Sequence, residues 1–234
     1  MNRNTCLTAL CLFVISFVNF AEARTLSMLN FSTQIANAPT WNVDWGEVNN
    51  SATISFSTTM SGNNNHWSRA VIDFTNPAFV DEFGDSGSFL SLNRPDPVGS
   101  GGMTQADIHF ENPLPEGSMM LVLDVDARNE VLALQAAGGI NLGTPQTLES
   151  MSGTASTFAA WDSATTTLTT VSNGPNNDRE AYFWDVSGLQ DLQLQYTTHS
   201  GSAQVGFVVP EPSTASLCVM VSFLILLGGR RRIS

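Results

Sequence analysis

The sequence contains no lysine, and all nine of its basic residues are arginines. Cysteine is also scarce: Cys6 and Cys11 lie near the start, and Cys218 lies near the end. The chain between them therefore has no disulfide and no thiol chemistry. A folded domain in this region must gain its stability from a large apolar core.

Positive charge is in short supply in residues 24–208. This stretch holds five arginines against 19 acidic residues, which leaves a net charge of about −14. Such a surface repels nucleic acid and anionic lipid headgroups, so no nucleic-acid partner is predicted. It favours solubility, divalent cations or neutral glycans.

Residues 1–23 have the three parts of a secretory signal peptide. Arg3 supplies the positive charge, and an apolar run follows from Leu7 to Val18. Small residues at Ala21 and Ala23 then form an A-x-A site before Arg24. We therefore predict export and cleavage by signal peptidase between Ala23 and Arg24.

A second apolar run, from Ala215 to Gly229, lies near the end of the chain. As a helix its 15 residues would be about 22 Å long, which is short for a hydrocarbon core of about 30 Å. The arginines that follow favour a cytoplasmic C-terminus, with the domain outside; they are Arg230, Arg231 and Arg232. The pattern predicts a hydrophobic helix in the inner membrane.

A proline-rich motif precedes this run and consists of Val209, Pro210, Glu211, Pro212 and Ser213. The motif, the apolar run and the arginine cluster together resemble the PEP-CTERM sorting domain of Gram-negative bacteria. The resemblance covers only residues 209–234. It implies that an exosortase, a membrane-embedded cysteine protease, cleaves near Pro-Glu-Pro and releases or transfers the domain. It also implies a place beside exopolysaccharide systems; an ordinary C-terminal anchor is the alternative.

Residues 24–208 are predicted to form one all-β domain. Short runs with alternating, β-branched and aromatic residues recur between breaks rich in Gly, Pro, Asn and Ser. The expected strands are 52–58, 69–74, 107–111, 118–126, 165–172, 180–186, 189–197 and 203–209. Eight or more such strands indicate a two-sheet β-sandwich, jelly-roll-like in topology. Only residues 131–137 are expected to form a short helix.

Two strands have patterns that predict which side chains face inward. Leu192, Leu194 and Tyr196 alternate with polar residues, so they are expected in the core. In the run 118–126, one side is purely apolar and is expected to face the core, namely Met119, Leu121, Leu123 and Val125.

No catalytic residue is predicted. The run from Phe83 to Ser86 looks like the opening block of GDSL-type hydrolases, but the histidine that must activate the serine is missing from its place. The three histidines, His66, His109 and His199, lack the spacing of a zinc motif.

Two kinds of binding residue remain as hypotheses. A calcium site would use carboxylates near turns, namely Asp124, Asp126 and Asp178; a solvated acidic surface is the alternative. A glycan site would use tryptophans in polar surroundings, namely Trp41, Trp45 and Trp67; burial in the core is the alternative.

The sequence thus predicts an exported, non-enzymatic protein, held briefly in the membrane by its tail and then placed at the cell surface or outside the cell. Its expected partners are signal peptidase, an exosortase and extracellular polysaccharide. The alternatives are a carbohydrate-binding module with exposed tryptophans and, more distantly, an exported hydrolase.

Overall fold

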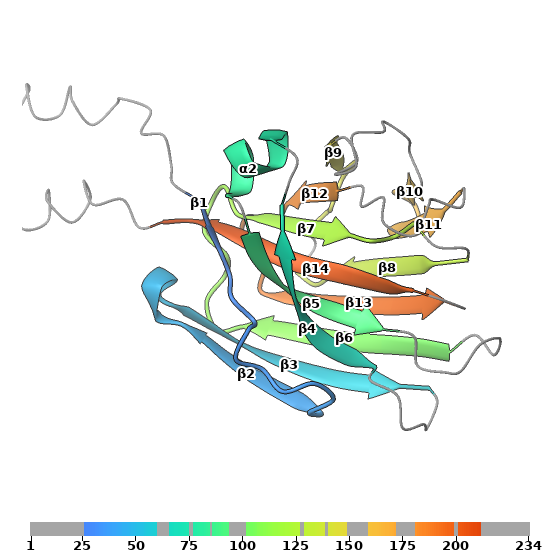
Figure 1. Cartoon of the computed structure of the whole chain (residues 1–234), viewed down its shortest axis with the longest axis horizontal. Helices are drawn as coiled ribbons and strands as arrows, with labels where there is room; N and C mark the ends of the chain where they lie inside the picture. The colour runs from blue at the N-terminus through green and yellow to red at the C-terminus, as the bar shows by residue number, and fades with distance from the viewer. Residues whose placement is uncertain are drawn as a thin grey trace, which may run out of the picture.

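The chain folds into two antiparallel sheets that pack face to face (Figure 1). The computed structural model describes residues 26–59, 66–74, 77–84, 86–93, 102–126, 129–138, 140–148, 159–171, 181–198 and 201–211. Each sheet has seven strands, and within each sheet all neighbouring strands pair in antiparallel fashion. The predicted all-β sandwich is confirmed.

One sheet, called here the covered sheet, has the order β4-β5-β14-β7-β12-β9, with β1 paired to β14. Its strands are β1 (Leu26–Met28), β4 (Trp67–Asp73), β5 (Ser86–Asn93), β7 (Met119–Leu123), β9 (Gln146–Leu148), β12 (Ala181–Asp185) and β14 (Ser202–Pro210).

The other sheet, called the open sheet, has the order β10-β11-β8-β13-β6-β3-β2. Its strands are β2 (Thr40–Trp45), β3 (Asn50–Thr58), β6 (Gly102–Phe110), β8 (Val131–Ala136), β10 (Ala159–Asp162), β11 (Thr167–Thr170) and β13 (Asp191–Thr198). From β5 to β9, and again from β11 to β14, each strand lies in the opposite sheet to the one before it. This alternation is typical of double-sheet jelly rolls.

All eight expected strands are present, with ends that differ from the predicted ones by a few residues. The predicted helix at 131–137 is wrong, because these residues form β8 between β11 and β13. The α-helix in the described residues is α2 (Pro77–Phe83) instead. A run of seven residues carries too little periodicity to distinguish the two, and here sheet pairing decides.

The main core lies between the two sheets. Leu192, Leu194 and Tyr196 all face it from β13, as predicted. It also contains buried aromatic rings from β2 and β6, among them Trp45 and Phe110, whose ring centroids lie 6.1 Å apart. Alternation along β13 therefore fixes which side chains this strand presents to solvent on its other face.

A second apolar cluster covers the outer face of the covered sheet. Here the prediction for β7 needs correction: Met120 and Val122 face the main core, whereas Leu121 and Leu123 face this second cluster. The sequence pattern was misleading because β7 is buried on both sides. Its apolar residues on either face are therefore compatible with a core.

Helix α2 supplies much of this cover. Pro77 begins the helix, where its fixed φ angle and missing N–H are tolerated. Gly84 follows its last residue with a φ of 90°, and its N–H bonds the Val80 carbonyl. Phe79 and Phe83 project from the helix and are buried in the second cluster, where Phe83 contacts Phe183 of β12.

Candidate polar binding face

The outer face of the open sheet carries polar side chains on neighbouring strands. Alternation places them opposite the core residues of β3, β6, β13 and β8. We call this set the polar face; its members are Thr53, Ser55, Ser57, Gln105, Asp107, His109, Gln135, Asp191, Gln193 and Gln195.

Strand register arranges these residues in rows across the sheet. One row runs from Ser55 through Asp107 and Gln193 to Gln135, and each adjacent pair is directly opposed on neighbouring strands. Because opposed residues lie about 5 Å apart, a ligand that crosses the strands meets one polar side chain after another.

Hydrogen bonds hold the centre of the face in one arrangement. The carboxylate of Asp107 accepts from Gln105 Nε2 at 2.8 Å and from Gln193 Nε2 at 2.7 Å. Gln195 Nε2 in turn lies 2.9 Å from Gln193 Oε1 and 3.2 Å from Gln105 Oε1. Each carboxamide has two N–H donors and two acceptor lone pairs, so this network leaves capacity for further partners.

The polar face is hollowed rather than flat. A depression of about 440 Å³ is lined by the central row and by residues of the next row, including Thr53, His109 and Asp191. We call it the first hollow. Ile108, Leu192 and Ala136 also line it, but their side chains face the main core, so they contribute backbone to its floor. Polar groups that converge on a depression are a feature of small-molecule sites.

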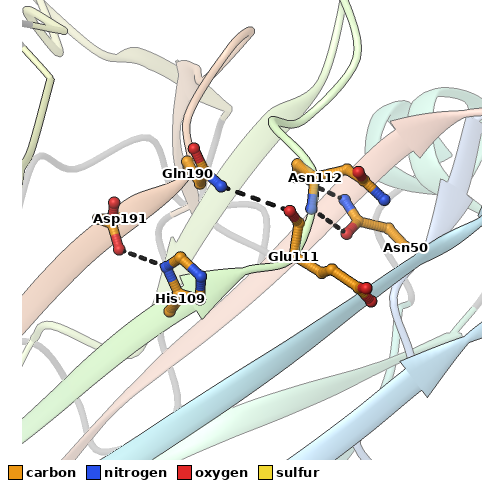
Figure 2. A network of polar contacts seen from close by, with 6 residues as sticks. All are labelled: Asn50, His109, Glu111, Asn112, Gln190 and Asp191. Carbon is orange, nitrogen blue, oxygen red and sulfur yellow. Dashed lines mark hydrogen bonds and ion pairs between the residues drawn. The ribbon is translucent and has the colours of Figure 1, made fainter.

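His109 and Asp191 form a pair at one side of the first hollow (Figure 2). His109 Nδ1 lies 2.6 Å from Asp191 Oδ1, and the two side chains are 58% and 52% exposed. An N–H at Nδ1 donates to the carboxylate, which leaves Nε2 for a ligand. The side chains come from β6 and β13, so sheet pairing positions them together.

Positive charge is absent from this face among the described residues. The arginine that the structure describes, Arg69, lies on β4 of the covered sheet and donates to the Gln34 carbonyl at 2.8 Å. The face itself carries the carboxylates of Asp107 and Asp191. Its electrostatics therefore disfavour polyanions and accommodate neutral or cationic ligands.

The tryptophans predicted to hold a glycan do not lie on this face. Trp41, Trp45 and Trp67 are only 1%, 2% and 7% exposed and pack in the main core. Their indole N–H groups donate to the carbonyls of Ile35, Asn30 and Ala38. The expectation of exposed ring faces is therefore wrong, because Trp41 and Trp45 fall on the inward positions of β2 and Trp67 on an inward position of β4.

Two of the three predicted calcium ligands are described. Asp124 accepts hydrogen bonds from Ser202 Oγ and Gln204 Nε2, both at 3.1 Å, while Asp126 is buried. Asp178 lies outside the described residues. Within the ranges that the structure covers, no group of three or more His, Cys, Asp or Glu residues is placed to hold a metal ion.

The first residues of the proline-rich motif belong to the sandwich. Val209 and Pro210 end β14 and pair with Ser27 and Leu26 of β1, and Ser27 Oγ donates to Glu211 Oε1 at 2.8 Å. The remaining end residues lie outside the described residues, namely Ala21, Ala23, Arg24, Pro212, Ser213, Arg230, Arg231 and Arg232. Among the helices of the described part of the chain, none is long and apolar enough to cross a membrane.

Comparisons with known proteins add little. No protein-family model matches the chain, and no curated protein sequence does. Among solved structures, the enzymatically active domain of bacteriophage CBA120 tailspike protein 4 is 12% identical, with a TM-score of 0.30 over 67% of this chain and 19% of that one. A structure described as showing the promiscuous specificity of carbohydrate-binding modules from the β-sandwich superfamily is 9% identical, with a TM-score of 0.26. That match covers 81% of this chain and 86% of the other. Overlaps this loose do not decide a function.

The sequence pattern could predict that the polar face exists, but not which residues meet on it. Gln193 and Gln195 alternate with the core residues of β13, so their place on the outer face could be predicted. Their meeting with Gln105 and Asp107 depends on the register between β13 and β6. These strands are about 90 residues apart in the chain, as the separation of 90 between Gln105 and Gln195 shows, so no local motif reveals the contact.

Proposed function

We propose that this protein is a non-enzymatic, exported β-sandwich that binds extracellular polysaccharide through the polar face. The observation that supports this best is the first hollow, where carboxylate, carboxamide, hydroxyl and imidazole groups from four adjacent strands line one depression. A sugar presents hydroxyl groups around its rim and C–H groups on its faces. The hollow offers hydrogen-bond partners for the rim, and the CH2 groups of Gln135 and Gln193 offer apolar contact for the faces.

The charges of the face indicate a neutral glycan. The carboxylates of Asp107 and Asp191 accept from hydroxyl groups, and hydrogen bonds to charged groups are the stronger kind. Repulsion from these carboxylates, and from the acidic domain as a whole, works against uronate- or sulfate-bearing chains. The ligand class is therefore a neutral, hydroxyl-rich polymer.

The route out of the cell forms the second part of the proposal. Residues 1–23 direct export, and the PEP-CTERM-like tail holds the domain at the inner membrane until an exosortase cuts near Pro-Glu-Pro. The short distance from the folded domain to the apolar run supports this: β14 ends at Pro210, and only residues 211–214 separate it from Ala215, so the domain would lie close to the membrane before processing. After cleavage the domain works at the cell surface or in the extracellular matrix.

Affinity electrophoresis tests the binding proposal. The domain is run through gels containing mixed-linkage β-glucan, mannan, galactan or anionic alginate. We expect retardation by at least one neutral polymer and none by alginate. The double variant Asp107→Ala/Gln193→Ala should lower the apparent affinity at least tenfold, because it removes two hydrogen-bonding groups.

A matched control uses the same residue types on the covered sheet. The double variant Asp73→Ala/Gln146→Ala changes exposed residues of β4 and β9, and each polymer should retard it, relative to a polymer-free gel, as much as it retards the unmodified domain. The binding proposal is overturned if no neutral polymer retards the domain, or if the control variant loses as much affinity as the polar-face variant.

Intact mass spectrometry of the protein from an exosortase-containing host tests the export proposal. We expect a mature species that begins at Arg24 and lacks the apolar tail. Alanines in place of Pro210, Glu211 and Pro212 should leave a membrane-bound species that keeps its tail. A wild-type protein that keeps its full tail in that host contradicts the processing step.

A further inference from the structure

A second hollow lies beside the first one. It measures about 470 Å³ and is lined by residues of β2, β3 and the segment after β6, including Asn42, Asp44 and Glu111. Its chemistry repeats that of the first hollow, with carboxamides, carboxylates and hydroxyls and no arginine among its lining residues. The similarity raises the question of whether the two hollows serve one ligand.

Thr53 lines both hollows. On β3 it opposes Asn42 of β2 on one side and His109 of β6 on the other. His109 in turn opposes Asp191 of β13, so a single row of polar side chains runs from one hollow into the other. Thr53 Oγ1 donates to Asn42 Oδ1 at 3.3 Å, which links the first residues of that row.

The side of the second hollow is held by reciprocal hydrogen bonds (Figure 2). Asn50 Nδ2 donates to the Asn112 carbonyl at 3.0 Å, and the Asn112 N–H donates to Asn50 Oδ1 at 3.1 Å. Ser51 Oγ donates to Glu111 Oε2 at 2.6 Å. These bonds tie the segment after β6 to β3, so the walls of the second hollow are fixed before any ligand binds, which lowers the ordering cost of binding.

We infer that the two hollows are parts of one groove, and that the ligand is an extended neutral polysaccharide chain that crosses the strands from β8 to β2 and passes Thr53 where the two hollows meet. This inference rests on the proposed function and extends it from a sugar-binding surface to a polymer-binding groove. Four strand spacings of about 4.8 Å give the groove a length of about 19 Å.

The shallow shape of the hollows favours a polymer over a single sugar. Both are open depressions, so a single small ring would leave much of its surface in water. A chain that fills both hollows makes contacts in each while it loses its translational freedom only once. Affinity is therefore expected to rise steeply when the chain becomes long enough to reach the second hollow.

Chain length is the variable that tests this inference. Oligosaccharides of increasing length are prepared by partial hydrolysis of whichever neutral polymer retards the domain most, and are titrated by isothermal calorimetry. For the unmodified domain we expect affinity to rise at least tenfold between chains that fill one hollow and chains that span both. A flat dependence on length overturns the groove.

A pair of variants separates the two hollows. Asn42→Ala/Asp44→Ala removes exposed side chains of β2 and should lower the affinity for long chains about tenfold, with no change for short ones. The control Thr40→Ala/Glu47→Ala removes a hydroxyl and a carboxylate that border neither hollow, and it should bind like the unmodified domain. Thermal unfolding of both variants verifies that the fold is retained.

The outcomes distinguish this inference from the proposed function. If Asp107→Ala/Gln193→Ala abolishes binding but length and the β2 variant have no effect, the polar face binds sugar and the single groove is wrong. If the β2 variant weakens the binding of short and long chains equally, the substitutions have altered the structure of the first hollow instead of removing contacts in the second. That outcome also contradicts the groove. If no chain binds at all, the proposed function itself fails.

Discussion

The two sheets of this protein have the same number of strands, but the outer face of one is apolar and buried, whereas the outer face of the other is polar and exposed to solvent. The covered sheet presents Phe89, Leu121 and Leu123 outward, where helix α2 and strand β1 bury them in the second cluster. The open sheet presents Asp107, Gln193 and their neighbours to solvent, around two hollows. Figure 1 shows α2 beside the covered sheet at the β7 and β12 end.

The difference shows which face is free to act. An apolar sheet face must be covered because exposed apolar area costs about 25 cal/mol per Å². Side chains of α2 and β1 cover the outer face of the covered sheet, so apolar packing on both of its faces contributes to stability. The open sheet needs no cover on its outer face, because its side chains are hydrated or bonded to one another. Function is therefore expected there.

The largest effect is expected where the cover is removed. Phe79 is fully buried, and its ring centroid lies 3.9 Å from that of Phe74. Phe79→Ala should lower the free energy of unfolding by about 3–5 kcal/mol, the usual cost of emptying a buried phenylalanine site. Urea denaturation followed by tryptophan fluorescence measures it.

Val71→Ala is the control for this prediction, because Val71 lies on β4 of the same sheet but is 66% exposed. It should change stability by less than about 0.5 kcal/mol. If Phe79→Ala costs as little as this control, the second cluster does not contribute to stability and the contrast between the two faces fails.

The sequence predicted the sandwich better than it predicted these faces. Period-two alternation identified β13 and its inward residues, because one side of that strand is polar. On β7 both sides are apolar, so alternation could not show that Leu121 faces a second cluster and Met120 the main core. Short strands such as β1 and β9, with three residues each, carry too little pattern to be predicted at all.

The candidate site was not predicted for a related physical reason. Aromatic residues drew attention to Trp41 and Trp45, yet their alternation with Asn42 and Asp44 on β2 places the rings inward and the polar residues outward. Asn42 and Asp44, the residues that do lie on the outer face, stand next to these tryptophans in the sequence. Their grouping with residues of β6 and β13 depends on long-range register, which a local pattern does not contain.

A buried polar pair sharpens the comparison from within the open sheet. Tyr196 faces the main core from β13, and its hydroxyl donates to Glu130 Oε1 at 2.5 Å, with both residues fully buried. Burial, and then the negative charge of Glu130, raise the pKa of Tyr196 well above the ordinary value of 10.0. The folded state therefore holds this proton at pH values where the unfolded chain releases it.

The sign of the pH dependence follows from this shift. The stability that Tyr196 contributes is fully present below pH 10.0, and it falls as the pH rises further toward the raised pKa of the folded state. The slope for this one group is up to about 1.4 kcal/mol per pH unit. Because the chain has no lysine, only Tyr182 and Tyr196 among the side chains of residues 24–208 ordinarily titrate near pH 10.

Tyr196→Phe should therefore remove a large part of the alkaline loss of stability. It should also cost about 1–3 kcal/mol at neutral pH, because the buried Glu130 carboxylate loses a hydrogen-bond donor. Urea denaturation of both proteins between about pH 8 and pH 11.5 measures the two effects, a range that brackets the ordinary tyrosine pKa. An unchanged alkaline slope in the variant contradicts the assignment.

The smallest effect on stability is expected at the residue before Tyr196, whose side chain lies on the outer face of β13. Gln195 precedes Tyr196 on β13 but points to solvent, where its carboxamide bonds Gln105 and Gln193. Gln195→Ala should change the free energy of unfolding by less than about 0.5 kcal/mol, because Gln195 is only half-buried and water can replace the lost partners. Equilibrium urea denaturation beside Tyr196→Phe measures the contrast within one strand. If Gln195→Ala lowers the free energy of unfolding as much as Tyr196→Phe does, the side chains of the polar face are needed for stability. The argument that this face is available for a ligand would then fail.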